Sequence, residues 1–337
     1  MKALVCRRPG ELILEDRSPP GPPGAGWALV SISHVGICGT DYHIFEGKHP
    51  YLAYPRVMGH ELAGTVTAIG EGAPIRIGER VVVNPYFACG RCIACRHNKP
   101  NCCAAIEVLG VHRDGGMCEE LLVPIDNLYP IGSLPLDHAA AVEFLAIGAH
   151  AVGRSKLAAG TRALVIGAGP IGLATALFAR IAGQIVTIMD VRRERLDFAE
   201  GQLGFPVIDG LSLSPVDLVR ERTDGECFDL VFDATGNKAS IEAAFAYVAH
   251  GGALIMVSVI KEEISFSDPE FHKREMILMG SRNALRVDFD HVMAAMHDDT
   301  VPVAKLITHR TTLRDSLRDI PHWVHQKSGL IKAVIAV

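Results

Sequence analysis

The feature that most constrains the fold of this chain is a glycine-rich turn between two apolar runs. Ala163-Leu-Val-Ile leads directly into Gly167-Ala-Gly-Pro-Ile-Gly172, a helix-like stretch follows, and a second apolar run ends at Asp190. A buried strand, such a turn, a helix and an acidic residue about 20 positions further on together indicate a dinucleotide-binding βαβ unit. The segment therefore predicts a doubly wound, parallel-sheet Rossmann domain.

Each residue of the turn has a physical role in such a unit. Gly167 allows the tight turn, Gly169 lets the backbone approach a pyrophosphate, and Gly172 lets helix and strand pack closely. Pro170 and Ile171 open the helix, whose N-terminal N–H groups and partial positive charge attract phosphates. We predict that these five residues bind the cofactor.

The carboxylate of Asp190 determines which dinucleotide is expected. It can accept hydrogen bonds from the adenosine ribose hydroxyls, and its charge repels a 2′-phosphate, so NAD is favoured over NADP. Arg192 and Arg193 follow closely, and because a nearby arginine can accommodate that phosphate, they leave some use of NADP open. Asp190 and Arg192 complete the predicted cofactor site.

A second constraint is a run of cysteines with the spacing C-x2-C-x2-C-x7-C. Thiolates at such spacing can surround one tetrahedral Zn²⁺ in a closed, structural site. The bacterial iron–sulfur run has a shorter last gap and a proline after its fourth cysteine, whereas Ala104 stands there in this chain. Disulfides remain the other alternative, although nine cysteines, an odd number, suit a reducing compartment better. The predicted zinc ligands are Cys89, Cys92, Cys95 and Cys103.

Length and charge narrow the class of protein. A chain of 337 residues is long enough for about two domains. The net charge is −5 and basic residues form no block, which argues against a nucleic acid or an anionic membrane as partner. The N-terminal residues lack the long apolar core and the cleavage site of a signal peptide. We expect a cytoplasmic protein that acts on a small molecule.

The chain divides into three parts. Residues 1–150 carry short β-type runs separated by Gly- and Pro-rich turns, which indicates an irregular β-rich domain. Strand-like and helix-like segments alternate over 151–285, as expected of βαβ units. Residues 286–337 hold a helical stretch and end in an apolar run. In the middle part we predict strands at 162–167, 185–190, 229–233, 252–259 and 276–281, and helices at 170–182, 192–203 and 240–249.

A second set of possible metal ligands is scattered along the chain. The residue types alone are weak evidence for a metal site, because isolated His and Cys residues more often have a structural role. Their context strengthens them. Cys38 lies in Gly36-Ile-Cys-Gly-Thr-Asp-Tyr-His43, and His60 and Glu61 lie in Gly59-His-Glu-Leu-Ala-Gly64. Glu143 lies in Val142-Glu-Phe-Leu-Ala-Ile-Gly148.

At these segments, the cysteine run and the glycine-rich turn, the chain resembles the zinc-containing medium-chain dehydrogenase/reductase family. The resemblance covers nearly the whole chain. It implies a GroES-like catalytic domain at 1–150, with a structural zinc lobe at about 86–105. Residues 286–337 would complete this domain, and a Rossmann NAD-binding domain would be inserted at 151–285. The implied active site lies in the cleft.

The resemblance also implies a catalytic zinc site. Cys38 and His60 match zinc ligands of the family. Glu61 and Glu143 match two carboxylates, of which one contacts the metal and the other lies just outside its ligand shell. Which of the two carboxylates contacts the metal differs in the family with substrate or redox state. A proline commonly follows the second carboxylate in the family, whereas Phe144 follows Glu143 here. Two zinc ions per chain and NAD are the implied cofactors.

Thr40 and His43 match the family's proton relay. Zn²⁺ makes a bound alcohol far more acidic, and three protein ligands leave a fourth position open for it. A hydride then passes to the nicotinamide, while the Thr40 hydroxyl, the nicotinamide ribose and His43 carry the proton to solvent. Two other classes of protein fit only part of these features. A zinc-ribbon binding protein would use only the cysteine run, and a zinc-free reductase of the same broad fold would lack both metal sets.

Three segments look most like a bacterial branch of the family that includes starvation-sensing-type dehydrogenases and L-galactonate or L-gulonate 5-dehydrogenases. They are 54–61, 109–116 and 305–310. The resemblance implies oxidation of a secondary hydroxyl of a sugar acid, with a polyol of the sorbitol or L-iditol type second and L-threonine third. It also implies a homodimer or homotetramer. The residues predicted to bind the substrate carboxylate are His112, Arg113, Arg282 and Asn283.

Overall fold

The computed structural model describes residues 1–48, 52–72, 74–156, 158–326 and 328–337. Its contacts divide the chain into two compact units: unit 1 comprises Met1–Phe144 and Leu285–Val337, and unit 2 comprises Leu145–Ala284. The sequence placed these divisions near residues 150 and 285. Helix α4 (Val142–Ser155) runs across the first of them. Unit 2 is therefore an insertion within the sequence of unit 1.

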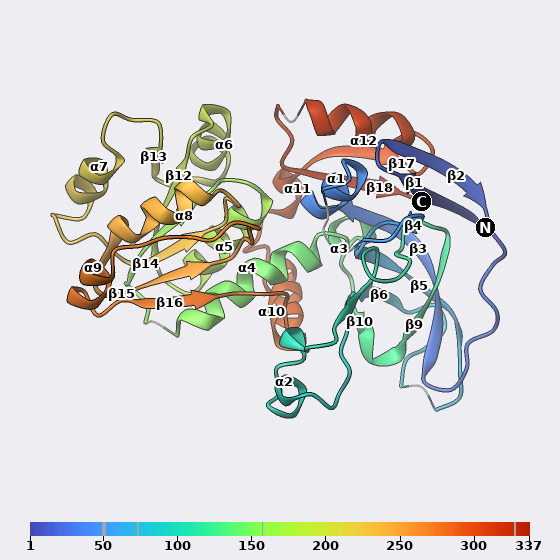
Figure 1. Ribbon diagram of the computed structural model, residues 1–337. Helices are drawn as coiled ribbons and strands as arrows, with labels where there is room; N and C mark the ends of the chain where they lie inside the picture. The colour runs from blue at the N-terminus through green and yellow to red at the C-terminus, as the bar shows by residue number, and fades with distance from the viewer. Residues whose placement is uncertain (49–51, 73, 157, 327) are drawn as a thin grey trace. The chain divides into compact units, whose positions relative to one another are not determined.

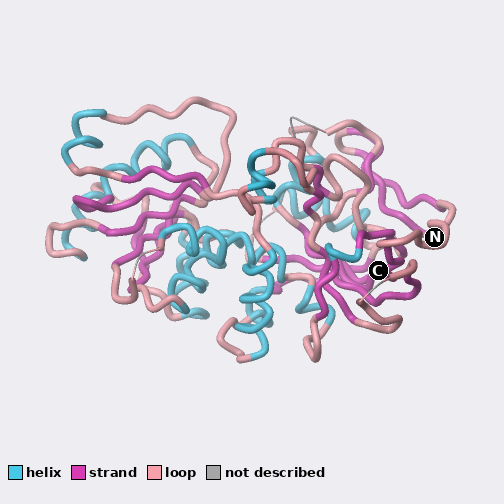
Figure 2. The backbone as a smooth tube through the Cα atoms, turned by 90° about the horizontal axis from the view of Figure 1, so that it is seen from below, coloured by secondary structure: helices cyan, strands magenta, loops and turns pink. Residues whose placement is uncertain are grey.

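Unit 2 is built on a parallel sheet. Over the described residues this sheet has six strands in the order β13-β12-β11-β14-β15-β16, and each neighbouring pair is parallel. Helices lie on both sides of the strands (Figure 2). Because both faces are covered, β11 (Arg162–Ile166) is almost continuously apolar. The predicted Rossmann fold is confirmed.

The strand order places the glycine-rich turn where the direction of winding reverses. The chain moves outward from β11 to β12 (Ile185–Asp190) and β13 (Val207–Asp209), then returns to the other side of β11 with β14 (Phe228–Asp233). In open α/β sheets, ligands bind beyond the carboxyl ends of the strands at this point. The remaining elements of unit 2 are α5 (Pro170–Ile181), α6 (Arg193–Leu203), α7 (Pro215–Arg222), α8 (Lys238–Ala244), the 3-10 helix η3 (Phe245–Tyr247), β15 (Val248–Met256), α9 (Asp268–Lys273) and β16 (Ile277–Gly280).

Unit 1 is rich in β-structure (Figure 1). Among the residues described, its larger sheet has seven strands, in the order β10-β6-β5-β3-β18-β17, with β9 also paired to β3. β3 (Trp27–Ile37) has β5 (Glu61–Ile69) on one side and β18 (Lys332–Ala336) on the other. Both pairs are antiparallel, so the end of β3 meets the starts of β5 and β18: Gly36 faces Glu61 and Ile37 faces Ala333.

A smaller sheet of unit 1 pairs β1 with β2 and β4. The apolar core of the unit gathers residues from both sheets and from helix α12, among them Val5, Val35, Val57 and Trp323. The remaining strands are β1 (Lys2–Arg8), β2 (Glu11–Asp16), β4 (Arg56–Val57), β6 (Arg80–Val83), β7 (Tyr86–Phe87), β8 (Glu107–Val108), β9 (Glu120–Pro124), β10 (Leu128–Pro130) and β17 (Ile307–Thr312). The helices are α1 (Gly39–Phe45), α2 (Ile93–Arg96), η1 (Pro100–Cys102), η2 (Ile125–Asn127), α3 (Leu136–Ala139), α10 (Arg286–His297), α11 (Val303–Leu306) and α12 (Ser316–His325).

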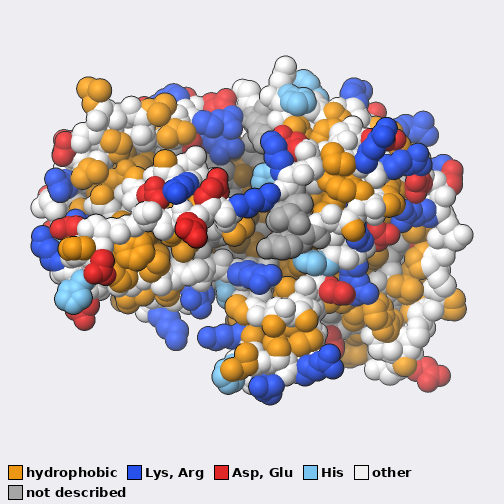
Figure 3. Space-filling model, in the orientation of Figure 1, with side chains coloured by type: hydrophobic (Ala, Val, Ile, Leu, Met, Phe, Trp, Pro, Cys, Tyr) orange, Lys and Arg blue, Asp and Glu red, His pale blue; other side chains and the backbone are white. Residues whose placement is uncertain are grey.

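The surface carries both signs of charge. On the face shown in Figure 3, Lys and Arg side chains are interspersed with Asp and Glu side chains and with apolar ones. Across the described ranges, no helix combines the length and the apolar character needed to cross a bilayer.

Candidate metal centres and nucleotide site

Three of the metal ligands predicted from the sequence converge where the end of β3 meets the start of β5. Cys38 follows β3, His60 precedes β5 and Glu61 begins it, and one ligand atom from each lies within 4.8 Å of the others. His60 is 6% exposed and Glu61 is 0% exposed. No side chain fits at Gly36, which faces Glu61, because a Cβ there would come within 2.8 Å of the Ala140 carbonyl oxygen.

The buried polar atoms of this trio fit a metal ion. His60 Nδ1 and Glu61 Oε1 have no hydrogen-bond partner among the described residues, although leaving such groups unpaired costs roughly 1–3 kcal/mol each. Burial acts to lower the pKa of His60, but the adjacent Cys38 thiolate overrides it and the pKa is raised well above its usual value. A site that favours extra positive charge, lined by nitrogen, sulfur and oxygen donors, suits Zn²⁺.

Glu143 lies near this trio but is held differently. It is the second residue of α4 and is 3% exposed. Its Oε1 accepts a hydrogen bond from the Tyr86 hydroxyl. Burial raises its pKa to about 7, with the nearby Glu61 charge acting in the same direction. The structure thus groups Glu61, and not Glu143, with Cys38 and His60. Tyr86 was missed by the sequence reasoning, which offered no reason to pair it with a residue so distant in the chain.

The two relay candidates lie on α1, immediately after Cys38. Thr40 Oγ1 lies 3.7 Å from Cys38 Sγ, and His43 is exposed on the same helix. Asp41, fully buried between them, accepts hydrogen bonds from the backbone N–H of Cys38 at 2.9 Å and of Gly59 at 3.2 Å. It therefore ties together the two segments that carry the metal trio. Its only sequence signal was an acidic residue in the first turn of a helix.

The cysteine run forms a second, separate cluster. The four Sγ atoms lie within 4.8 Å of one another, and none of the cysteines, all of which lie in described ranges, forms a disulfide. The N–H of Cys89 donates to Cys103 Sγ at 3.2 Å. Backbone N–H groups of Cys95 and Ala104 lower the pKa of the Cys92 thiol to about 6. Converging sulfurs with donors aimed at them fit a closed tetrahedral zinc site.

The glycine-rich turn has the predicted geometry. Gly167 has a φ of 98°, and a Cβ on Gly172 would lie 1.6 Å from the Gly167 carbonyl oxygen, so neither position accepts a side chain. Pro170 begins α5, with Gly169 as its N-cap. Asp190, at the end of β12, accepts hydrogen bonds from the N–H of Ala168 at 2.6 Å and of Arg192 at 2.8 Å. The carboxylate is thus fixed against the turn.

The arginine beside this turn is one that the sequence reasoning did not name. The Arg192 guanidinium pairs with Glu194, and that of Arg193 pairs with Asp197. Arg195 Nη1 instead lies 3.9 Å from Asp190 Oδ2, and it would lie 3.2 Å from a Cβ atom added to Gly169. Arg195, in the first turn of α6, therefore lies beside the glycine-rich turn.

The predicted substrate residues are distributed over both units. Arg113, in unit 1, places its guanidinium 4.6 Å from the centre of the Phe87 ring, and His112 Nδ1 accepts the N–H of Val108 at 3.1 Å. Arg282 and Asn283 belong to unit 2. The structure does not describe the four as one site.

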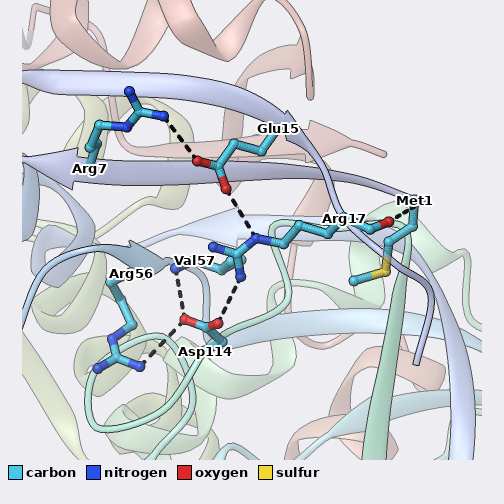
Figure 4. Close-up of polar contacts among 7 residues, drawn as sticks. All are labelled: Met1, Arg7, Glu15, Arg17, Arg56, Val57 and Asp114. Atoms are coloured by element: carbon cyan, nitrogen blue, oxygen red, sulfur yellow. Dashed lines mark hydrogen bonds and ion pairs between the residues drawn. The ribbon is translucent and has the colours of Figure 1, made fainter. Parts of the chain in front are cut away.

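The segment that carries Arg113 is anchored by Asp114 (Figure 4). The Asp114 carboxylate accepts hydrogen bonds from the backbone N–H of Val57 at 3.0 Å and from Arg17 Nη1 at 2.9 Å. Val57 ends β4, just ahead of His60. The carboxylate therefore fixes the 109–116 segment to the strand that leads into the metal trio.

Comparison with known proteins agrees with this geometry. The model of the alcohol dehydrogenase GroES-like domain matches residues 24–133, and that of the zinc-binding dehydrogenase family matches residues 170–299. An L-galactonate-5-dehydrogenase of Escherichia coli K12 is 39% identical over 99% of this chain and 98% of its own. The chain belongs to the zinc-type medium-chain dehydrogenase family. The predicted zinc-dependent, NAD-linked alcohol dehydrogenase and its GroES-like and Rossmann fold are thereby confirmed.

Two further relatives of this dehydrogenase are informative. A D-altritol 5-dehydrogenase of Agrobacterium fabrum is 35% identical over 88% of both chains. The crystal structure of an alcohol dehydrogenase, rspB of E. coli CFT073, in complex with NADH superposes with a TM-score of 0.94 at 29% identity, over 100% of this chain and 99% of that one. Family membership excludes the zinc-ribbon binding protein and the zinc-free reductase.

Proposed function

We propose that this dehydrogenase uses NAD to oxidise a secondary hydroxyl of a sugar acid, a hexonate such as L-galactonate or L-gulonate, to the keto acid. The observation that carries the proposal is the 39% identity to an L-galactonate-5-dehydrogenase over 99% of this chain. A hexonate bears a carboxylate, so its site needs a cation or several donors. Arg113, anchored through its neighbour Asp114, supplies such a cation in unit 1; its Nε lies 3.7 Å from the exposed Glu107 carboxylate, which the substrate carboxylate would replace.

The metal roles follow from the two clusters. Cys38, His60 and Glu61 hold a catalytic zinc, and the four clustered cysteines hold a structural one. A bound catalytic zinc supplies a Lewis acid that makes an alcohol more acidic. Glu143, restrained by Tyr86, stays outside the trio. Thr40 and His43 take the proton from the site to the exposed side of α1. The glycine-rich turn, Asp190 and Arg195 bind NAD.

A neutral polyol is the second candidate substrate, favoured by the 35% identity to a D-altritol 5-dehydrogenase. The discriminating experiment is a screen of NAD reduction over hexonates, polyols and threonine, followed by the Arg113→Ala and Arg282→Ala variants. For a hexonate we expect the KM to rise by about 10- to 100-fold, the loss of one charged hydrogen bond. Turnover of a neutral polyol should not change.

Arg8→Ala is the matched control, because Arg8 pairs with Glu11 on the surface of unit 1, at 2.6 Å. It should leave both KM values unchanged. If the hexonate KM is the same in the Arg113→Ala and Arg282→Ala variants as in the unmodified enzyme, the anion site is wrong. If polyols turn over far more efficiently than hexonates, the substrate class is wrong.

Replacing Asp190 by alanine is expected to narrow the preference for NAD. The variant loses a charged acceptor for the ribose hydroxyls and a charge that repels the 2′-phosphate, and Arg195 is placed to meet that phosphate. We expect kcat/KM for NAD to fall about 10- to 100-fold relative to that for NADP. Steady-state kinetics with both cofactors measure this ratio.

Asp209→Ala is the control for this result, since Asp209 lies opposite Asp190 on β13 and accepts the N–H of Leu211 at 2.8 Å. Its cofactor preference should match that of the unmodified enzyme. Equal efficiency of the unmodified enzyme with NAD and NADP would refute the role of Asp190.

Replacing Tyr86 by phenylalanine is expected to lower kcat while the protein stays folded. The phenyl ring fills the same space, but Glu143 loses the hydroxyl that restrains it beside the metal trio. Loss of such outer partners typically costs about 10- to 100-fold in activity or metal affinity. The measurements are kcat, zinc content and thermal stability.

Tyr129→Phe is a matched control. It also removes a buried tyrosine hydroxyl, one that accepts a hydrogen bond from Asn84 Nδ2 at 2.8 Å, but it leaves Glu143 untouched. Its kcat should be close to that of the unmodified enzyme. Equal kcat values for the two variants would show that the Tyr86 contact with Glu143 has no part in turnover.

A further inference from the structure

We propose that Lys332 is a positioning residue of the catalytic metal site, which orients Glu61 and, through its charge, weakens the binding of zinc. The inference rests on the proposed ligand set of Cys38, His60 and Glu61. It concerns a residue in the last strand of unit 1, far in sequence from all three.

The side chain of Lys332 is buried beside the proposed metal site. It is 1% exposed, and its Nζ contacts Glu61 Oε2. It also donates a hydrogen bond to the carbonyl oxygen of Ile37 at 3.0 Å and lies 4.5 Å from the centre of the Phe144 ring. A lysine is almost never fully buried unless its charge is paired, and here its anionic partner is a proposed zinc ligand.

The strand register explains how this contact arises. β18 begins at Lys332 and pairs with the end of β3, whose other neighbour is β5, the strand that begins at Glu61. Backbone hydrogen bonds hold these strands together without the lysine charge. A buried ion pair is weak evidence for a stabilising role, because well-packed apolar residues often stabilise a core as much. The charge at this position therefore needs another reason, and the metal site supplies one.

The two oxygens of Glu61 are in different environments. Neither oxygen has a hydrogen-bond partner among the described residues. Oε2 forms an ion pair with Lys332 Nζ, whereas Oε1 forms no ion pair with a described residue. The ammonium group thus fixes the carboxylate in one orientation and leaves Oε1 as the available donor. A Zn²⁺ ion held by Glu61 would share this anion with the ammonium group and would be repelled by it, because like charges in a poorly screened site interact strongly.

If Lys332 is a positioning residue, removing its charge should tighten zinc binding, whereas the loss of a purely structural lysine should leave zinc binding unchanged or weaker. Lys332→Met removes the repulsion and the competition, so we expect Zn²⁺ to bind the catalytic site about tenfold more tightly or better. Without zinc, the same variant leaves Glu61 buried and unpaired, which destabilises the protein. The difference in Tm between zinc-loaded and zinc-stripped protein should therefore widen, and kcat should fall because Glu61 is no longer oriented.

The experiment measures zinc affinity by chelator competition, together with Tm and kcat. Lys332→Arg keeps the charge and should restore the affinity of the unmodified enzyme. Lys2→Met is the matched control, because it removes an exposed Lys–Asp pair of unit 1, at 2.7 Å, and should change nothing. Unchanged or weaker zinc binding by folded Lys332→Met would overturn the proposal.

A double variant keeps the test decisive if Lys332→Met does not fold. Glu61→Gln combined with Lys332→Met removes both buried charges, a change that cores often tolerate, and should bind Zn²⁺ more tightly than Glu61→Gln alone. Equal affinity of the two would refute the charge effect. Failure of the ligand set is a separate result: Cys38→Ser would then retain as much zinc as the unmodified enzyme.

Discussion

Replacing Cys38 by serine is expected to abolish NAD-linked turnover while the protein remains folded. The variant removes the thiolate from the trio with His60 and Glu61, and an open site with one ligand lost no longer holds its metal in place. The loss should exceed the roughly 10- to 100-fold effect of removing an outer partner. Zinc content should fall from two ions per chain to one, measured with kcat and circular dichroism on the same sample.

Cys102→Ser is the control, because Cys102 is exposed and belongs to neither cluster. It should retain both zinc ions and full activity. A fully active Cys38→Ser enzyme, or unmodified enzyme that is fully active with one zinc or none, would be incompatible with two metal sites of separate function.

Cys92→Ser is expected to have the opposite profile, a loss of stability. Few side chains of the lobe at 89–103 are buried: none of the residues of α2 is, and the buried residues of the lobe are Asn101 and Cys103. Structural zinc sites contribute folding free energy directly. We expect Tm to fall by roughly 5 °C, which corresponds to about 3–4 kcal/mol in a chain of this size, and soluble yield to drop.

Limited proteolysis should find new cleavage within 89–103 in this variant, and zinc content should fall by one ion per chain. Protein with one zinc, an unchanged Tm and no new cleavage would show that the cluster does not stabilise the lobe. Protein that still binds two zinc ions would show that Cys92 is not a ligand.

Much of unit 2 was predictable because its signals are local. The predicted strand at 162–167 is Arg162–Ile166, and the predicted helix at 170–182 is Pro170–Ile181. Buried parallel strands are apolar runs, and glycine marks the turn between them. The sequence reasoning missed Val207–Asp209 and Pro215–Arg222. The first is too short to show a period and is defined by its pairing with β12.

The candidate site was predictable only in part, for a related reason. Cys38 and His60 lie in motifs whose neighbours identify them. Tyr86, Arg195 and Lys332 do not, because their positions depend on which strands pair and which helix face meets the turn. Burial and register bring them to the site, and neither is visible in one sequence.

The insertion of unit 2 within unit 1 imposes an order on synthesis. Leu145–Ala284 leaves the ribosome before Leu285–Val337 does, so unit 2 has all of its strands while unit 1 still lacks β17 and β18. Until then, the backbone of β3 at 34–37 has no partner on the side that β18 will occupy. An unpaired strand edge can join other chains. The nascent protein is therefore most prone to aggregate during the interval in which β3 has been synthesised but β18, its partner at 34–37, has not.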